Sequence, residues 1–128
     1  MAHNDELANA AAQGNIGTVE QLLNNGADPN GINSFGRTPI QVMKMGCPSL
    51  CQLLLRHGAD PNRQDNQQIA IIHDVAREGF LDTLQVLVEI GMADTNLRDR
   101  NNRLPIDLAM QNNHGDVVTY LSNLAQGD

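Results

Sequence analysis

The sequence has few aromatic residues and few cations. Two Phe, one Tyr and no Trp among 128 residues mean that any core is built from aliphatic side chains. Eight Lys and Arg stand against fifteen Asp and Glu, which gives a net charge of -7. Phosphate binding needs clustered cations, so this balance argues against a nucleic-acid partner and favours a basic protein surface as partner.

Long apolar stretches are also missing. No segment approaches the roughly 20 apolar residues of a membrane span, and the N-terminus lacks the apolar core of a signal peptide. An intracellular protein with no membrane association is therefore expected. The length and the 41% content of hydrophobic residues predict one globular domain.

Only two cysteines are present, Cys47 and Cys51, four positions apart. A disulfide over so short a loop would constrain the unfolded chain very little. As metal ligands the two thiols lack close companions, although His57 is near in sequence. We expect reduced structural thiols and no metal or cofactor; a metal site or a redox switch is the alternative.

Internal repetition determines the fold prediction. The pentapeptide GADPN occupies residues 26–30 and again residues 58–62, and a more divergent copy occupies residues 91–96. The alanines of the three copies are 32 and 34 positions apart, close to the ankyrin period of about 33 residues. Met92 is an insertion in the third copy.

Helix-opening residues recur in step with this pentapeptide. Thr38, Ala70 and Leu104 each follow the alanine of their copy by 11 residues. Pro39 and Pro105 suit a first helical turn, where a missing N–H costs nothing. The two landmarks predict an all-α ankyrin-repeat solenoid of four helix-turn-helix repeats joined by hairpin-like fingers. We expect one domain over residues 1–128, with repeats at about 5–36, 37–68, 69–102 and 103–126.

Turn geometry gives two further expectations. In the first finger Gly36 supplies a positive φ, whereas Gln68 and Asn102 occupy the equivalent positions. Because only Asn tolerates that geometry well, the second finger is expected to be looser or differently shaped. The second helices are expected to end on left-handed glycines, namely Gly26, Gly58 and Gly91.

The first helix of repeat two is predicted to be short. Gly46 follows its helix-opening residue by 8 positions, whereas Gly79 follows by 9, and Pro48 restricts the residue before it to extended geometry. We predict barely one helical turn over residues 41–45. Methionine adapts to varied surfaces, so Met43 and Met45 are candidate contact residues; filling of the core is the alternative for either.

Residues 73–84 carry more charge than the packing of two short helices requires. Asp74, Arg77, Glu78 and Asp82 fall at the ends or on the outer faces of the predicted helix pair. The functional site is therefore sought here. The apolar residues of the same pair are expected to face inward: Val75, Ala76, Leu81, Leu84, Leu87 and Val88.

Residues 33–46 and 73–84 resemble, almost residue for residue, the INK family of inhibitors of cyclin-dependent kinases four and six, and residues 103–109 extend the match. The short first helix of the second repeat is also a feature of that family, and four repeats are typical of its shorter, tumour-suppressor members. The resemblance implies a monomeric, non-enzymatic protein of cytoplasm and nucleus. It would bind the catalytic subunits of kinases 4 and 6 opposite the cyclin side, distort the ATP site, weaken cyclin binding and restrain G1 progression.

The resemblance also implies that the kinase contacts the concave side formed by the fingers and the first helices. Asp74 is the leading candidate, paired with a kinase arginine; stabilisation of its own helix N-terminus is the alternative. Asp65 is expected either to face the kinase or to be an ordinary turn aspartate. Arg77 is expected as an interface residue or as an intramolecular partner of Asp65 or Asp74.

The remaining candidates have weaker support. Phe80 can stack on the kinase or cover the edge of the core, and Asp82 is expected to cap the second helix with a peripheral contact. His73 is expected to keep a structural role, hydrogen-bonding between neighbouring turns. Three residues of the short helix are expected to contact the kinase: Gln41, Val42 and Met43.

Two rival functions remain. An ankyrin adaptor could hold another basic partner, such as a transcription factor, on its acidic concave face, because ankyrin stacks serve many partners. Catalysis is not expected: the sequence has no Gly-rich phosphate loop, and no serine has a recognisable nucleophile setting.

Overall fold

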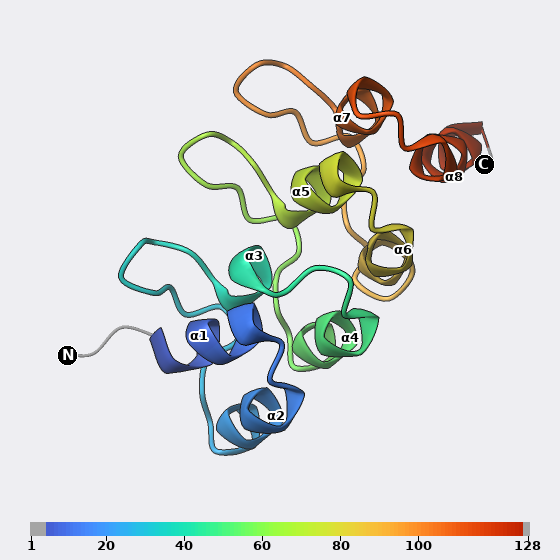
Figure 1. Cartoon of the computed structure of the whole chain (residues 1–128). Helices are drawn as coiled ribbons and strands as arrows, with labels where there is room; N and C mark the ends of the chain where they lie inside the picture. Colours follow the sequence, from blue (N-terminus) through green and yellow to red (C-terminus); the bar gives the residue numbers. More distant parts are fainter. Residues whose placement is uncertain (1–4, 127–128) are drawn as a thin grey trace.

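The computed structural model describes residues 5–126, and Figure 1 shows helices joined by turns and long loops over this range. Eight helices lie within it: α1 Asp5–Gln13, α2 Ile16–Asn24, α3 Pro39–Val42, α4 Pro48–Arg56, α5 Ile71–Glu78, α6 Leu81–Glu89, α7 Pro105–Gln111 and α8 Gly115–Gln126. No helix in the described range is long and apolar enough to cross a lipid bilayer.

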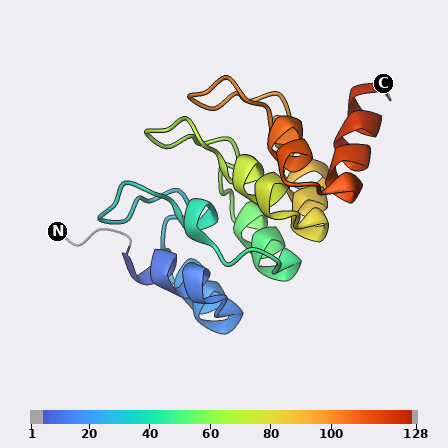
Figure 2. The same cartoon turned by 45° about the horizontal axis from the view of Figure 1, so that its top comes forward.

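The helices form two parallel rows. Helices α1, α3, α5 and α7 stack as an inner row, and α2, α4, α6 and α8 stack behind them as an outer row (Figure 1). Three long loops, the fingers, project from the inner row to the same side in both views (Figures 1 and 2). The fingers and the inner helices together form the concave face. This architecture confirms the predicted all-α ankyrin solenoid.

The core is aliphatic, as predicted from the scarcity of aromatic residues. Its fully enclosed side chains come from both rows and include Ile40, Leu50, Leu54, Ile72, Leu84 and Leu87. Burying each such side chain contributes about 1.5–3 kcal/mol relative to leaving it in water. In residues 73–88 four of the six predicted core residues are buried, whereas Leu81 and Val88 are only half-buried.

The inner helices α3, α5 and α7 begin with the same hydrogen bond. The side chain of the third helical residue accepts the backbone N–H of the residue before the helix, which satisfies a donor that the helix itself leaves free. Three different side chains do this: Gln41 Oε1 lies 2.7 Å from Thr38 N, His73 Nδ1 lies 3.0 Å from Ala70 N, and Asp107 Oδ2 lies 2.9 Å from Leu104 N.

His73 also links neighbouring repeats. Because its Nδ1 accepts a hydrogen bond from Ala70, its Nε2 carries the proton and donates to the carbonyl oxygen of Leu97, 2.9 Å away. The ring is fully buried and both of its nitrogens are satisfied. The structural role predicted for His73 is confirmed.

The three fingers turn in the same way, so the expected difference in the second finger is wrong. Asp65 Oδ1 accepts the backbone N–H groups of Gln67 and Ile69 at 2.8 and 3.0 Å. These bonds hold Gln68 at φ 59°, close to the 63° of Asn102 in the third finger. The aspartate therefore fixes a turn that the glutamine alone would disfavour.

One predicted helix end is also wrong. Gly26 and Gly58 follow α2 and α4 with φ 96°, but Gly91 is not left-handed, and Met92 takes that conformation with φ 55°. Ile90 still has α-helical torsions at the end of α6. Helix α6 has nine residues, as α2 and α4 do, so the inserted residue extends the turn after the helix and the left-handed position comes one residue later.

Helix α3 is a single turn of four residues, as predicted, but it begins two residues earlier and ends three residues earlier than the predicted range 41–45. Neighbouring repeats supply the bonds that a longer helix would make. The backbone N–H of Lys44 donates to the carbonyl oxygen of Ala11 at 2.9 Å, and that of Gly46 donates to Thr83 Oγ1 at 3.1 Å. Thr83 is fully buried, a position that the apolar pattern did not predict.

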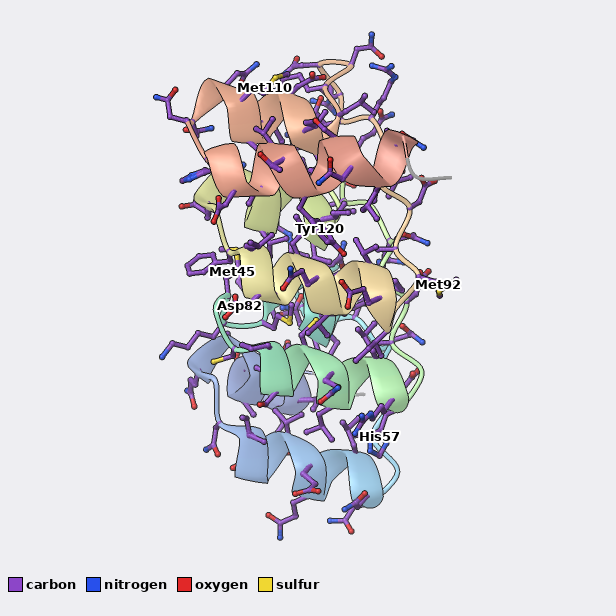
Figure 3. The ribbon with its side chains drawn as sticks, turned by 90° about the vertical axis from the view of Figure 1, so that its right-hand side faces the viewer. Met45, His57, Asp82, Met92, Met110 and Tyr120 are labelled. Atoms are coloured by element: carbon purple, nitrogen blue, oxygen red, sulfur yellow. The ribbon has the colours of Figure 1, made fainter. Side chains whose placement is uncertain are left out.

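Side chains of one repeat cover the helix bend of the preceding repeat. Gly46, with φ 81°, ends the bend of repeat two, and a Cβ atom placed on it would lie 2.9 Å from Phe80 Cε1. Gly79, with φ 83°, lies in the same way under the ring of His114. In the outer row, Tyr120 Oη donates to Glu89 Oε2 at 2.9 Å and joins α8 to α6 (Figure 3).

Candidate protein-binding site

A hollow of about 330 Å³ opens on the concave face between the second finger, α3 and α5. Gln41, Asp65, Asp74 and Arg77 line it, so four of the eight predicted contact residues lie together. They come from three separate elements that the repeat stacking brings side by side. The apolar part of the lining is Met45, Ile69, Ala70 and Ile71.

Asp74 lies in the first half of α5 and pairs with Arg77 one turn later. Arg77 Nη2 donates to Asp74 Oδ1 at 2.8 Å, and Arg77 Nε also reaches Glu78 Oε2 at 3.4 Å. The Asp74 side chain is 25% exposed. Of the two intramolecular partners predicted for Arg77, the structure shows Asp74.

Burial raises the pKa of Asp74 above its ordinary value, and the neighbouring charge of Asp65 adds to this, although Arg77 opposes it through its charge and its hydrogen bond. The ionised carboxylate is therefore less well stabilised here than in water, in spite of its arginine partner. A further cation placed against Asp74 would stabilise its ionised carboxylate. This makes Asp74 the group of the hollow that is best suited to attract a basic partner.

Asp65 has the role of a turn aspartate, because its Oδ1 holds the second finger. Its Oδ2 faces Arg37 of the first finger, with 3.4 Å to Arg37 Nη2. The side chain of Arg37 is 49% exposed and that of Asp65 is 15% exposed, so this is a long ion pair at the edge of the hollow. Such surface pairs contribute about 0–1 kcal/mol and exchange partners readily.

Gln41 lines the hollow but is not a free contact group. Its Oε1 accepts from the start of α3, and its Nε2 donates to the carbonyl oxygen of Arg63 at 3.3 Å. The side chain therefore connects α3 to the second finger. A partner would meet Gln41 as part of the wall of the hollow.

The other predicted contact residues do not line the hollow. Met43 is 3% exposed and belongs to the core, so its prediction as a surface contact is corrected and the alternative of core filling holds. The pattern misled because the one-turn helix α3 ends at Val42, and the chain then turns Met43 inward. Val42 itself is half-buried.

Phe80 and Asp82 lie at the bend between α5 and α6. Phe80 is 36% exposed, and its ring lies over Gly46 at the bend of the preceding repeat; both predictions for it stay predictions. The N-cap residue of α6 is Phe80, not Asp82 as predicted; Asp82 Oδ1 instead accepts the backbone N–H of Thr83 at 2.7 Å within the first turn. Figure 3 shows Asp82 at the edge of the stack.

One charged residue of the site was missed at the sequence level. Arg37 lines the hollow, although it was not predicted to contact a partner, whereas Met45 was a predicted candidate and does line it. Arg37 precedes Asp65 by 28 positions, slightly less than one repeat, and stacking of repeats places such residues side by side. This spacing is the signal that could have indicated the Arg37–Asp65 pair.

The two cysteines are free thiols. Cys47 is half-buried and Cys51 is fully buried, and burial raises the pKa of Cys51 to about 12. Since the thiolate is the reactive form, Cys51 is inert at neutral pH, as expected of a structural thiol. Residues 5–126 contain no group of three or more His, Cys, Asp or Glu placed to hold a metal ion.

Family models match most of the chain. The model "Ankyrin repeats (3 copies)" matches residues 40–127, and the model "Ankyrin repeat" matches residues 7–34. The chain is 53% identical to rat cyclin-dependent kinase 4 inhibitor B over 95% of the chain and 93% of the relative. The human protein of that name is 54% identical over 95% and 88%. Human cyclin-dependent kinase inhibitor 2A is 52% identical over 96% of the chain and 79% of the relative.

Proposed function

The chain belongs to the INK family of ankyrin-repeat inhibitors of cyclin-dependent kinases, and on that premise we propose that it inhibits kinases 4 and 6 by binding their catalytic subunits. It acts as a binding protein and not as an enzyme. The observation that carries the proposal is the hollow on the concave face, where Asp74 has a raised pKa and lies beside Asp65 and Arg77.

Asp74 forms the central contact in this proposal. A kinase arginine enters the hollow and pairs with the Asp74 carboxylate, while Arg77 keeps its place at the rim or turns toward Glu78. Closing the interface removes water from the pair. Loss of one partner from such a buried pair typically costs about 2–5 kcal/mol of binding free energy.

Inhibition follows from selective binding of one kinase conformation. The protein binds on the side of the catalytic subunit opposite the cyclin and holds a conformation with a distorted ATP site and a weakened cyclin surface. Because binding free energies are coupled reciprocally, the cyclin must weaken binding of the inhibitor by the same factor. A monomer acting in the cytoplasm and the nucleus would in this way restrain G1 progression.

The test uses the cyclin-free catalytic subunit of kinase 6. Titration of the protein should give a one-to-one complex, and cyclin D should lower the affinity by the same factor as the protein lowers the affinity for cyclin D. Equal activity of kinase 6 supplied with cyclin D, with and without prior incubation of the catalytic subunit with the protein, would overturn the proposal. A folded protein that does not bind the kinase would direct the search to the alternative, an adaptor for another basic partner.

A further inference from the structure

The charge of the molecule is divided between two regions. The fingertips, defined as residues 31–37, 63–69 and 98–103, contain two aspartates and five arginines, a net charge of +3. The rest of the chain contains three basic and thirteen acidic residues, a net charge of -10. The fingertips are therefore a basic surface on a strongly acidic protein. The five arginines are Arg37, Arg63, Arg98, Arg100 and Arg103.

Three of these arginines bond to backbone oxygens at the tips. Arg98 Nη1 donates to the carbonyl oxygen of Asn102 at 2.9 Å, and Arg100 Nη2 donates to that of Asn66 at 2.8 Å. Arg63 makes a longer contact of 3.5 Å to a carbonyl oxygen of the first finger. A guanidinium has five N–H donors, so one such bond orients the side chain and leaves donors for a carboxylate.

A second hollow, of about 230 Å³, lies between the tips of the first and second fingers. Phe35, Arg37 and Arg63 are part of its lining, and Phe35 is 85% exposed. An aromatic ring so exposed, flanked by two guanidinium groups, has the composition of a binding hot spot. The chemistry fits a carboxylate with an apolar neighbour.

The two hollows adjoin. Arg37, Asp65 and Gln67 line both of them, so a partner seated over Asp74 can also extend over the fingertips. The partner would then meet a carboxylate at one hollow and guanidinium groups at the other. Opposite charges at two points fix the orientation of a partner more strictly than one charge does.

We propose that the fingertip surface formed by Phe35, Arg37, Arg63 and Arg100 binds an acidic patch, with an adjacent apolar side chain, on the same kinase subunit. This inference rests on the proposed function and adds to it a second contact of opposite sign. The kinase presents a basic group to Asp74 and acidic groups to the fingertips. The fingertip contact steers association and sets the orientation of the complex.

The test compares variants that each remove one positive charge. Arg63→Gln and Arg100→Gln alter the fingertips, whereas Arg56→Gln removes an exposed charge at the end of α4, in the outer row. Association rates with the cyclin-free catalytic subunit of kinase 6 are measured at low and high salt, and melting curves verify that each variant folds. Phe35→Ser provides a variant with unchanged charge.

We expect each fingertip variant to lower the association rate about threefold or more at about 50 mM salt, with the difference shrinking at about 500 mM as screening grows. Arg56→Gln should leave the rate close to wild type, and Phe35→Ser should weaken binding at both salt concentrations. Wild-type binding together with fingertip variants that match Arg56→Gln would overturn this inference alone. No binding by the folded wild type would overturn both it and the proposed function.

Discussion

The bend at Gly79 holds α5, which carries Asp74, against the last repeat. Gly79 has φ 83°, and a Cβ atom added there would lie 2.6 Å from Cε1 and 2.8 Å from Cγ of the His114 ring. Gly26 has φ 96°, and a Cβ atom added there would have no neighbouring heavy atom within 4 Å. Alanine substitution at the two positions therefore differs mainly in packing against the next repeat.

The expected cost can be worked out from these two sites. A left-handed alanine costs about 1–2 kcal/mol, and both variants share that cost. Overpacking at Gly79 adds about 1–3 kcal/mol, because the imidazole must move away from its position over the bend. Gly26→Ala should therefore lower the free energy of unfolding by about 1–2 kcal/mol and Gly79→Ala by about 2–5 kcal/mol.

Urea unfolding of both variants measures these free energies. A third variant, Gly79→Ala with His114→Ala, removes the ring and should recover the packing part of the loss, which a double-mutant cycle with His114→Ala isolates. Equal losses for Gly26→Ala and Gly79→Ala, with no coupling to His114, would refute the reasoning. The repeats would then be coupled by other contacts.

Three further predictions concern single side chains. In the native protein a thiol reagent should modify Cys47 well before Cys51, whose pKa is raised by burial to about 12, and equal rates by mass spectrometry would contradict this. Burial opposes the charge of Asp99, but hydrogen bonds from Arg103 and Asn101 outweigh it and lower its pKa. Its stabilisation is therefore complete well above the ordinary carboxyl pKa of about 3.9 and is lost as pH falls through that value and then the lower folded value, so the stability advantage of wild type over Asp99→Asn should shrink only below about pH 5. Thr83→Val should lower stability by about 1 kcal/mol and speed hydrogen exchange of the Gly46 amide, whereas Thr83→Ser should leave that exchange slow.

The fold could be predicted from the sequence because two landmarks, the GADPN pentapeptide and the helix-opening residues, repeat with one period. The placement of Asp65 and Asp74 on one face came from the family resemblance and not from this periodicity. What the pattern missed depends on contacts between repeats. The burial of Thr83 and the inward turn of Met43 both result from the one-turn helix α3, whose missing bonds come from neighbouring repeats.

Local residue preference failed where a side chain elsewhere in the turn decides the geometry. Gln68 adopts the left-handed conformation because Asp65 holds the turn, a role that the preference of glutamine alone does not reveal. At Gly91 the residue preference failed in the opposite direction, because the glycine favours the left-handed conformation but does not adopt it. The inserted Met92 takes the left-handed conformation instead, in a turn that is one residue longer after a helix of unchanged length.

The most direct test of the account is calorimetric binding of the cyclin-free catalytic subunit of kinase 6 to wild type, Asp74→Asn and Glu20→Gln. Glu20 is an exposed carboxylate of α2 in the outer row, so its variant makes the same charge change away from the concave face. The account predicts tight binding by wild type and Glu20→Gln, with a loss of about 2–5 kcal/mol for Asp74→Asn at an unchanged melting temperature. Equal affinity of Asp74→Asn and Glu20→Gln would contradict it.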